Sequence, residues 1–471
     1  MEIVLITALV FVVYAKTINY SVIVDDIKWY DYIKNGGATV TKWTDWFTVV
    51  RQRLYGGATF GINTAIDHTF TVALFALACS LIYVAFGSNQ ISLCAALLFA
   101  VNAMNNQVSI WLNGRRYLIN IILVLSMLCL GSWGLPFYFL TPMFQVTAVF
   151  SPILLFNQSP LFLLAIPVVL LLGYRQIKTK IDLRLKTIPD QDRREFSPER
   201  LIIIVKYYGH YFFKMIFPGT CLMVYQRLSR WGITQEGNED AYSFNRDFYQ
   251  GILAIVLSVL LVVILPNEYK AMAIFMSIAT LQWCAIIPVT QDLADRYASL
   301  PNVFMMFFVS YIAHTYLANP GALLALIGGY YLAELYKVTP MYRDMKAYWS
   351  HQRFYNPSTV VPRRFEINWY MKRGDLMKAW MITREGLELN DKDFHFLVQA
   401  AVCHRGIGDF GLARKFAEKA SRNYYLYEKA TQEPQLTAFL KTLEPITKPA
   451  GSTSPDRMKK RAERMDRMAT V

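Results

Sequence analysis

Two adjacent carboxylates, Asp25 and Asp26, follow the first apolar segment of this 471-residue chain, in the stretch VDDIKWYDYIKNGG. Aromatic side chains such as Trp29 and Tyr30 accompany them. A carboxylate that is partly buried beside aromatic rings has a raised pKa and is a better general base than a solvated one. Neighbouring residues of an extended segment point to opposite sides, so we expect one base, with a slight preference for Asp26. The alternative is a pair of solvated acids in an interfacial loop.

The composition indicates that a bilayer positions these residues. Of all residues, 54% are hydrophobic and only 17% are charged, and the mean hydropathy is +0.27. Soluble domains carry roughly 25% charge. Apolar runs of membrane-spanning length recur along the chain and predict about eleven crossings. These runs lie at residues 2–16, 68–87, 91–108, 117–133, 135–156, 159–174, 201–224, 249–266, 270–289, 302–318 and 320–337.

The loops between these runs predict the orientation. Residues 175–200 contain eight Lys and Arg, the densest basic connection between crossings, and should therefore be cytoplasmic. Counting crossings from there places the loop at 17–67 and the region after residue 340 on the non-cytoplasmic side. Irregularly spaced tryptophans and tyrosines in the loop at 17–67 predict a helix in the membrane interface.

The net charge of +14 suggests membrane topology and anionic lipid rather than nucleic acid, because no stacked-aromatic module lies between the basic residues. Five of the six cysteines lie in apolar runs and indicate no compartment. No cysteine or histidine spacing resembles a zinc site.

A soluble helical composition begins near residue 340. The pairs Gly374-Asp375 and Gly408-Asp409 are 34 residues apart, as are Ala379 and Ala413. This is the tetratricopeptide period, with a turn at Gly-Asp and alanine at close helix contacts. We therefore divide the chain into a membrane domain at 1–340, tetratricopeptide-like repeats at 341–445 and a charged tail at 446–471.

Four short stretches occur in an order found in a known family. The acidic pair follows the first apolar run, GINTAIDHTF precedes the second, FAVNAMNNQVSIWLNGRRYLIN ends the third, and ADRYASLPNVF comes later. With the repeats behind them, they resemble the polytopic GT-C glycosyltransferases, most closely the transmembrane O-mannosyltransferases joined to tetratricopeptide repeats. One departure stands out, since Asn102, Asn105 and Gln107 replace two histidines and a glutamate of that family.

The resemblance implies an all-α polytopic membrane bundle that transfers a sugar from a polyprenyl-phosphate lipid to an acceptor hydroxyl, with inversion. The acceptor needs a carboxylate base, Asp26 or Asp25, and the leaving phosphate needs positive charge or oriented donors. The substrate-binding candidates are His68, Asn102, Asn105, Gln107, Arg115, Arg116, Lys206, His210, Arg296 and Tyr297. For the cations the alternative is a helix-end side chain reaching the interface, and for the amides it is helix capping.

The sequence thus predicts a multi-pass glycosyltransferase of a bacterial inner membrane or the endoplasmic reticulum. Its partners would be a polyprenyl-phosphate sugar, a protein or glycan acceptor and the membrane, but no nucleic acid. No cofactor is certain, and a divalent metal stays open. The alternatives are a transferase acting on a glycolipid or surface polysaccharide, and a non-catalytic scaffold that binds a partner through its repeats.

Overall fold

The computed structural model of this chain describes residues 1–23, 26–27, 30–31, 63–141, 146–171, 198–219, 243–284, 294–355, 357 and 360–424. Every regular element in these ranges is a helix, and no strand occurs in them. The predicted all-α class is therefore confirmed for the described part of the chain. The chain divides into two compact units, and the first consists of Met1–Trp231 and Gly237–Tyr348. The second consists of Gly232–Glu236 and Trp349–Val471.

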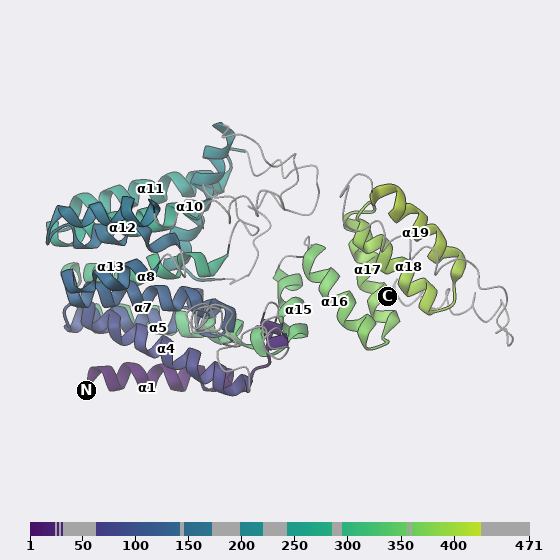
Figure 1. Cartoon of the computed structure of the whole chain (residues 1–471), viewed down its shortest axis with the longest axis horizontal. Helices are drawn as coiled ribbons and strands as arrows, with labels where there is room; N and C mark the ends of the chain where they lie inside the picture. The colour runs from purple at the N-terminus through teal and green to yellow at the C-terminus, as the bar shows by residue number, and fades with distance from the viewer. Residues whose placement is uncertain are drawn as a thin grey trace. The chain divides into compact units, whose positions relative to one another are not determined.

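The long helices of the first unit run alongside one another, with α1 at one edge and α10, α11 and α12 at the other (Figure 1). Asparagine side chains cap four of them, because Asn63, Asn89, Asn245 and Asn319 each accept hydrogen bonds from the first main-chain N–H groups. The helices are α1 (Glu2–Tyr14), α4 (Thr64–Ala85), α5 (Gln90–Val101), α7 (Arg115–Leu130), α10 (Pro198–Ile216), α11 (Arg246–Ile264), α12 (Asn267–Leu281), α13 (Ser299–Tyr316) and α14 (Pro320–Val338).

Shorter helices connect the long ones. Pro152 lies inside η7, where proline has no N–H to donate, and this apolar run remains in short pieces rather than one long helix. The short elements are η1 (Ala15–Asn19), η3 (Ala103–Asn105), α6 (Asn106–Ser109), η4 (Leu112–Gly114), η5 (Gly131–Gly134), α8 (Leu135–Leu140), η7 (Val146–Leu155), η8 (Pro160–Leu164), η11 (Asp295–Ala298) and η12 (Thr339–Arg343).

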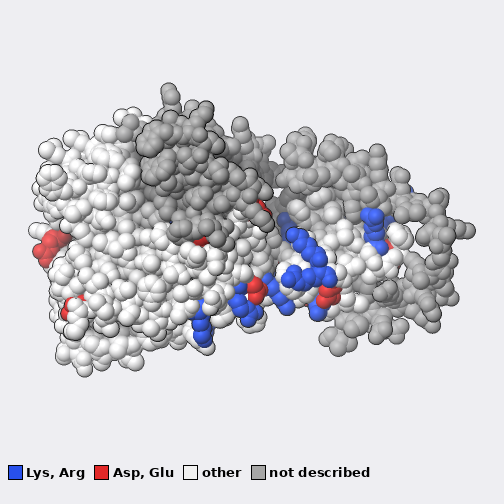
Figure 2. Space-filling model, turned by 60° about the horizontal axis from the view of Figure 1, so that its bottom comes forward, with Lys and Arg blue, Asp and Glu red and all other residues white. Residues whose placement is uncertain are grey.

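Several helices of the first unit have the length and composition of membrane spans. Among the described residues there are four such stretches, Glu2–Asn19, Thr64–Ala85, Leu112–Leu140 and Arg246–Ile264. A fifth arises if the helices at 90–109, bent by 57°, form one span. The face of the bundle seen in Figure 2 carries few charged side chains. A membrane protein is therefore supported, whereas the count of about eleven crossings stays a prediction.

Helix ends from distant parts of the sequence meet at one end of the bundle. The N–H and the hydroxyl of Ser21 both donate to the carbonyl of Arg343, at 3.1 and 2.9 Å. Helix α14 and η11 both contact η3, and η1 contacts η12. The start of the loop at 17–67 and the end of α14 therefore lie at the same end of the first unit, here called the polar end.

The second unit contains two helix pairs with equivalent turns. Gly374 and Gly408 both have positive φ, at +74° and +88°, a conformation that favours glycine. The carboxylates of Asp375 and Asp409 then accept from Lys378 N and Leu412 N in the next helix. The helices are α15 (Met345–Tyr355), which crosses the boundary between the units, α16 (Val360–Lys372), α17 (Leu376–Leu389), α18 (Phe394–Gly406) and α19 (Phe410–Tyr424). In the Gly-Asp pairs that recur in the sequence, the glycine thus forms the turn and the aspartate caps the next helix.

The cap at Asp375 is testable by substitution. Asp375→Ala should lower the unfolding free energy of the second unit by about 1 kcal/mol, because the first N–H groups of α17 lose their acceptor. Lys378→Ala is the matched control, since it removes an exposed ion pair and a contact with the Tyr370 ring but leaves the cap, and it should cost less than about 1 kcal/mol. Urea unfolding of the full chain measures the loss of unfolding free energy in both variants. Cleavage within α17 by a protease reports the unfolded fraction at each urea concentration. Equal losses in the two variants would contradict the capping role.

The common end of α1 and α14 predicts a labelling pattern. In a background without the native cysteines, Asn19→Cys and Lys346→Cys should react with a membrane-impermeant thiol reagent from the same side. Gln90 begins α5 and Ala318 lies between α13 and α14, both at the opposite end, so Gln90→Cys and Ala318→Cys should react from the other side. Labelling of Asn19→Cys and Lys346→Cys from opposite sides would contradict this arrangement.

Candidate functional site

Asp26 lies at the polar end, with only 1% of its surface exposed. Its Oδ1 accepts a hydrogen bond from the main-chain N–H of Asn113, at 2.9 Å. Asn113 belongs to η4, whose backbone passes against α6. A Cβ on Gly114 would lie 1.8 Å from the carbonyl oxygen of Gln107, so this turn requires glycine. The turn therefore presents a main-chain donor to a buried carboxylate. Asp25 lies outside the described residues.

A buried ion pair lies beside Asp26 and joins the first turns of α4 and α7. Arg115 Nη2 is 3.7 Å from Asp67 Oδ1, and neither side chain is exposed. Arg115 also donates to the hydroxyl of Thr71, from Nε at 3.1 Å and from Nη2 at 2.8 Å. Its charge interacts with Asp26 as well. Arg115 was predicted to bind substrate, but its guanidinium is engaged with α4.

Tyr30 completes this group from the loop that follows α1. Its hydroxyl donates to Asp67 Oδ2 at 2.6 Å. Burial and the neighbouring Asp67 carboxylate raise the pKa of Tyr30 above the usual value, so the phenol stays protonated and remains a donor. Asp67, Thr71 and Tyr30 were not among the sequence candidates. The signal that could have found Asp67 is its position as an acid at the start of an apolar run.

His68 and two neighbouring residues present polar atoms that have no hydrogen-bond partner in the described part of the chain. These atoms are His68 Nε2, Trp111 Nε1 and Asn113 Oδ1. The three residues are at most 4% exposed. A buried polar group without a partner costs about 1–3 kcal/mol. Trp111 and Asn113 lie at η4, and His68 lies on α4, which contacts η4.

Arg296 lies in an aromatic environment next to η4. Its guanidinium donates to Tyr117 Oη at 3.2 Å and to Gln107 Oε1 at 3.1 Å. It also lies over the Tyr297 and Trp111 rings, with centroids at 4.8 and 5.3 Å. Two predicted residues, Arg296 and Tyr297, are thus brought together with a third, Gln107. The aromatic rings exclude water around a permanent positive charge.

An aromatic stack extends this environment toward α12. The rings of Trp283 and Tyr297 are parallel within 2°, with centroids 4.0 Å apart. Trp283 Nε1 has no hydrogen-bond partner among the described residues. Arg116 also contacts Tyr117, with its guanidinium 5.1 Å from that ring and its Nη2 3.5 Å from the hydroxyl. The Arg116 assignment is therefore compatible with a site centred on Tyr117.

The predicted amides divide into two groups. Asn102 Nδ2 donates to Met215 O and its Oδ1 accepts from Met104 N, so both ends of the amide hold the backbone. Asn105 Nδ2 donates to Phe99 O, and its Oδ1 accepts from Asn302 Nδ2. These contacts favour the structural alternative for Asn102 and Asn105. Gln107 differs, because its oxygen contacts Arg296.

Helix α10 brings a further set of basic side chains to the interior of the bundle. Lys206, His210 and Lys214 recur at every fourth residue, and Lys206 is 1% exposed. Lys214 Nζ lies 3.5 Å from Asp295 Oδ1, and Asp295 directly precedes Arg296. Lys214 and Asp295 were missed by sequence reasoning, although Lys214 continues the spacing of the two predicted residues. Helix α10 and η11 are therefore joined by a buried ion pair.

Metal ligands are not evident in the described ranges. No group of three or more His, Cys, Asp or Glu side chains lies close enough there to hold a metal ion. The divalent metal left open by the sequence therefore has no proposed ligands.

Searches against protein-family models, curated proteins and solved structures find no match to this chain. What is shown, for the described residues, is a helical protein with several potential membrane spans. At one end it gathers a buried carboxylate, a buried arginine among aromatic rings and unpartnered polar atoms. Such an arrangement can take a proton from a bound hydroxyl and stabilise an anionic group beside it.

The ion pair between Arg115 and Asp67 gives a stability test. Asp67→Ala should destabilise the protein by about 3–5 kcal/mol, because the Arg115 charge stays buried without its partner. The double variant Asp67→Leu with Arg115→Met should recover part of this loss, since neither charge of the pair remains, while Asp26 loses a neighbouring cation. Thermal unfolding in detergent, followed by size-exclusion chromatography, measures both. Equal loss in the single and double variants would show that the buried charge is not the cause.

Proposed function

We propose that this protein is a membrane glycosyltransferase that moves a sugar from a polyprenyl-phosphate lipid to an acceptor hydroxyl, with Asp26 as the general base. The observation that best supports this proposal is the position of Asp26, a buried carboxylate held by η4 at the polar end of an apolar bundle. Trp111, which borders Arg296, and Asn113, which holds Asp26, are two residues apart on this turn. One bound molecule could therefore reach both groups.

The base has a defined task in this reaction. As the acceptor oxygen attacks the anomeric carbon of the sugar, the acceptor proton passes to the Asp26 carboxylate. The bond between that carbon and the phosphate oxygen breaks, and the polyprenyl phosphate leaves. Attack opposite the leaving group inverts the anomeric configuration. The Asn113 N–H orients the carboxylate through the bond to Oδ1.

The leaving phosphate requires a cation, and the structure favours Arg296 over Arg115 for this role. The Arg115 guanidinium is engaged by Asp67 and Thr71, whereas Arg296 donates to Tyr117 and Gln107 and lies over the Tyr297 ring. Arginine can bind phosphate through two parallel hydrogen bonds. Arg116, which also contacts Tyr117, would add charge nearby.

The sugar itself is assigned to the unpartnered polar atoms. His68 Nε2, Trp111 Nε1 and Asn113 Oδ1 are a nitrogen, an N–H donor and an amide oxygen, and sugar hydroxyls can bond to all three types. The face of an aromatic ring such as Trp283 suits the apolar face of a sugar. Gln107 would serve the sugar and the phosphate together through Arg296.

The acceptor is assigned to the second unit. Its equivalent turns repeat with a period typical of tetratricopeptide arrays, which present a concave surface to an extended peptide. We therefore favour a hydroxyl on a protein, at the non-cytoplasmic face of a bacterial inner membrane or the endoplasmic reticulum. A glycolipid or polysaccharide acceptor is the alternative for the same site.

A non-catalytic scaffold is the second candidate function. It is favoured by the amides at 102 and 105, which hold the backbone where the resembled family has ionisable groups. A scaffold would retain the fold without binding a lipid-linked sugar. Binding of the donor lipid therefore distinguishes the scaffold from the enzyme.

Asp26→Asn should lower the rate of sugar transfer at least about 100-fold, as expected for loss of a general base. Asp31→Asn is the control, since Asp31 is an exposed acid in the same segment and should keep full activity. The assay follows sugar release from a panel of polyprenyl-phosphate sugars by the purified chain. Asp25→Asn is measured alongside, because either acid was predicted to act.

The outcomes separate the candidate functions. Retained donor binding with lost turnover in Asp26→Asn, and weakened binding in Arg296→Gln, would support the proposal. Full activity of Asp26→Asn would exclude Asp26 as the base. A wild-type protein that neither binds nor turns over any donor lipid, yet captures a protein through residues 360–424, would be the scaffold.

A further inference from the structure

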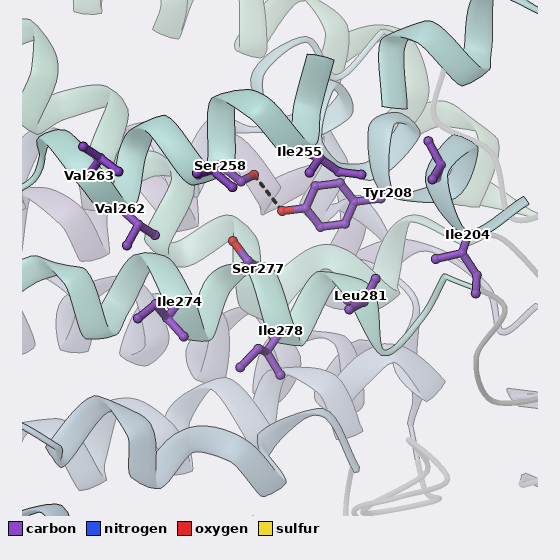
Figure 3. A pocket seen from close by; sticks show the side chains of 12 residues that line it. Ile204, Tyr208, Ile255, Ser258, Val262, Val263, Ile274, Ser277, Ile278 and Leu281 are labelled. Carbon is purple, nitrogen blue, oxygen red and sulfur yellow. Dashed lines mark hydrogen bonds between the residues drawn. The ribbon is translucent and has the colours of Figure 1, made fainter. Parts of the chain in front are cut away.

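Helices α10, α11 and α12 enclose a cavity of about 440 Å³ (Figure 3). Neither Asp26 nor Arg296 lines it, and its walls are aliphatic except for three hydroxyl side chains. Several lining residues are themselves accessible at the surface, with Val259 59%, Val263 68% and Ile274 39% exposed. The cavity is therefore open along one side.

The three hydroxyls in the wall already have partners. Tyr208 Oη and Ser258 Oγ are 2.7 Å apart, as the dashed line in Figure 3 shows. Ser258 Oγ also donates to Ala254 O at 2.8 Å, and Ser277 Oγ donates to Ala273 O at 3.0 Å. No charged side chain lines the cavity. A phosphate or a sugar would find few polar partners there, and an ordered water needs two to four.

The open side continues the apolar surface of α11. This helix is one of the four stretches with the composition of a membrane span. Its buried residues form a single stripe, Gly251, Ala254, Ser258 and Leu261. Val256 and Leu260, outside that stripe, are 55% and 48% exposed. In a bilayer this surface contacts hydrocarbon chains, and the cavity is continuous with it.

The backbones of α10 and α11 meet closely beside the cavity. A Cβ on Gly209 would lie 2.6 Å from the Cα of Gly251, so both positions require glycine for this approach. Such contact fixes the two helices and prevents them from closing the adjacent space by a simple shift. An empty apolar space of this size would forfeit dispersion contacts along all its walls.

We propose that one acyl chain of a bilayer phospholipid enters this cavity from the side and packs between α11 and α12. The aliphatic walls, the satisfied hydroxyls and the open lipid-facing side all fit a hydrocarbon chain. Phospholipid is the bulk component at that surface, so mass action favours its chains over those of a scarce carrier lipid. The bound chain fixes α12, and α12 leads directly to Trp283 and its stack on Tyr297.

Photolabelling of the full chain in phosphatidylcholine nanodiscs tests the proposal. The probe is phosphatidylcholine with a diazirine in the middle of one acyl chain, and adducts are located by mass spectrometry. Adducts are expected on the inward-facing residues Ser258, Ser277 and Ile278, as well as on the outward face of α11. Labelling confined to the outward face would overturn the proposal, and this measurement depends on no variant.

Two filling variants and one control sharpen the test. Ser277→Phe and Val262→Phe each place a ring in the cavity, from α12 and α11. Displacing two or more methylene groups should reduce the inward adducts about tenfold. Val256→Phe adds the same ring to the outward face of α11 and should leave them unchanged. Undiminished inward labelling in both filling variants would overturn the proposal.

A competition experiment identifies the source of the chain. Polyprenyl phosphate, added at the same concentration as the photoreactive lipid, should not reduce the inward adducts. Suppression by polyprenyl phosphate would overturn the proposal and assign the cavity to an isoprenoid tail. Because no sugar transfer is measured, this result is independent of the proposed catalytic function.

Discussion

The arrangement of the polar end depends on how an apolar helix bundle accommodates a buried positive charge. Arg115 has no exposed surface, and a charge in such a position is stable only with a partner and hydrogen bonds. Asp67 and Thr71 on α4 provide them, and Tyr30 adds a donor to Asp67. The pair therefore joins the first turns of α4 and α7, and it holds the residue that directly follows η4.

The remaining features of the polar end follow from that junction. With α7 held against α4, η4 packs on α6 and directs the Asn113 N–H to Asp26. A second ion pair, between Lys214 and Asp295, fixes η11 to α10 and so places Arg296 beside Tyr117. Both pairs combine a cation from one helix with an acid from another element. The proposed base and the proposed phosphate ligand are each positioned by a neighbouring salt bridge.

Sequence patterns were informative where local chemistry decides the outcome. The Gly-Asp period predicted two equivalent turns, because positive φ favours glycine and a following carboxylate caps a helix. Patterns were less informative for arginines, since Arg115 and Arg296 are both helix-end residues near glycine or aromatic neighbours. Only their surroundings distinguish them, with a carboxylate and a threonine for one and aromatic rings for the other. No pattern predicted the cavity beside Tyr208, because it arises from the separation of helices.

The sequence by itself determined the helical class, the apolar character of the first unit and the position of the repeated turns. Each of these depends on neighbouring residues, through hydrophobic runs, backbone preference and capping. The tertiary structure decided which charges are paired, which amides hold the backbone, and that Asp26 meets η4. Those outcomes depend on contacts between residues tens to hundreds of positions apart, such as Asp26 with Asn113 and Gln107 with Arg296. Burial then decides the result, because a polar group withdrawn from water must find its partner on whichever helix packs beside it.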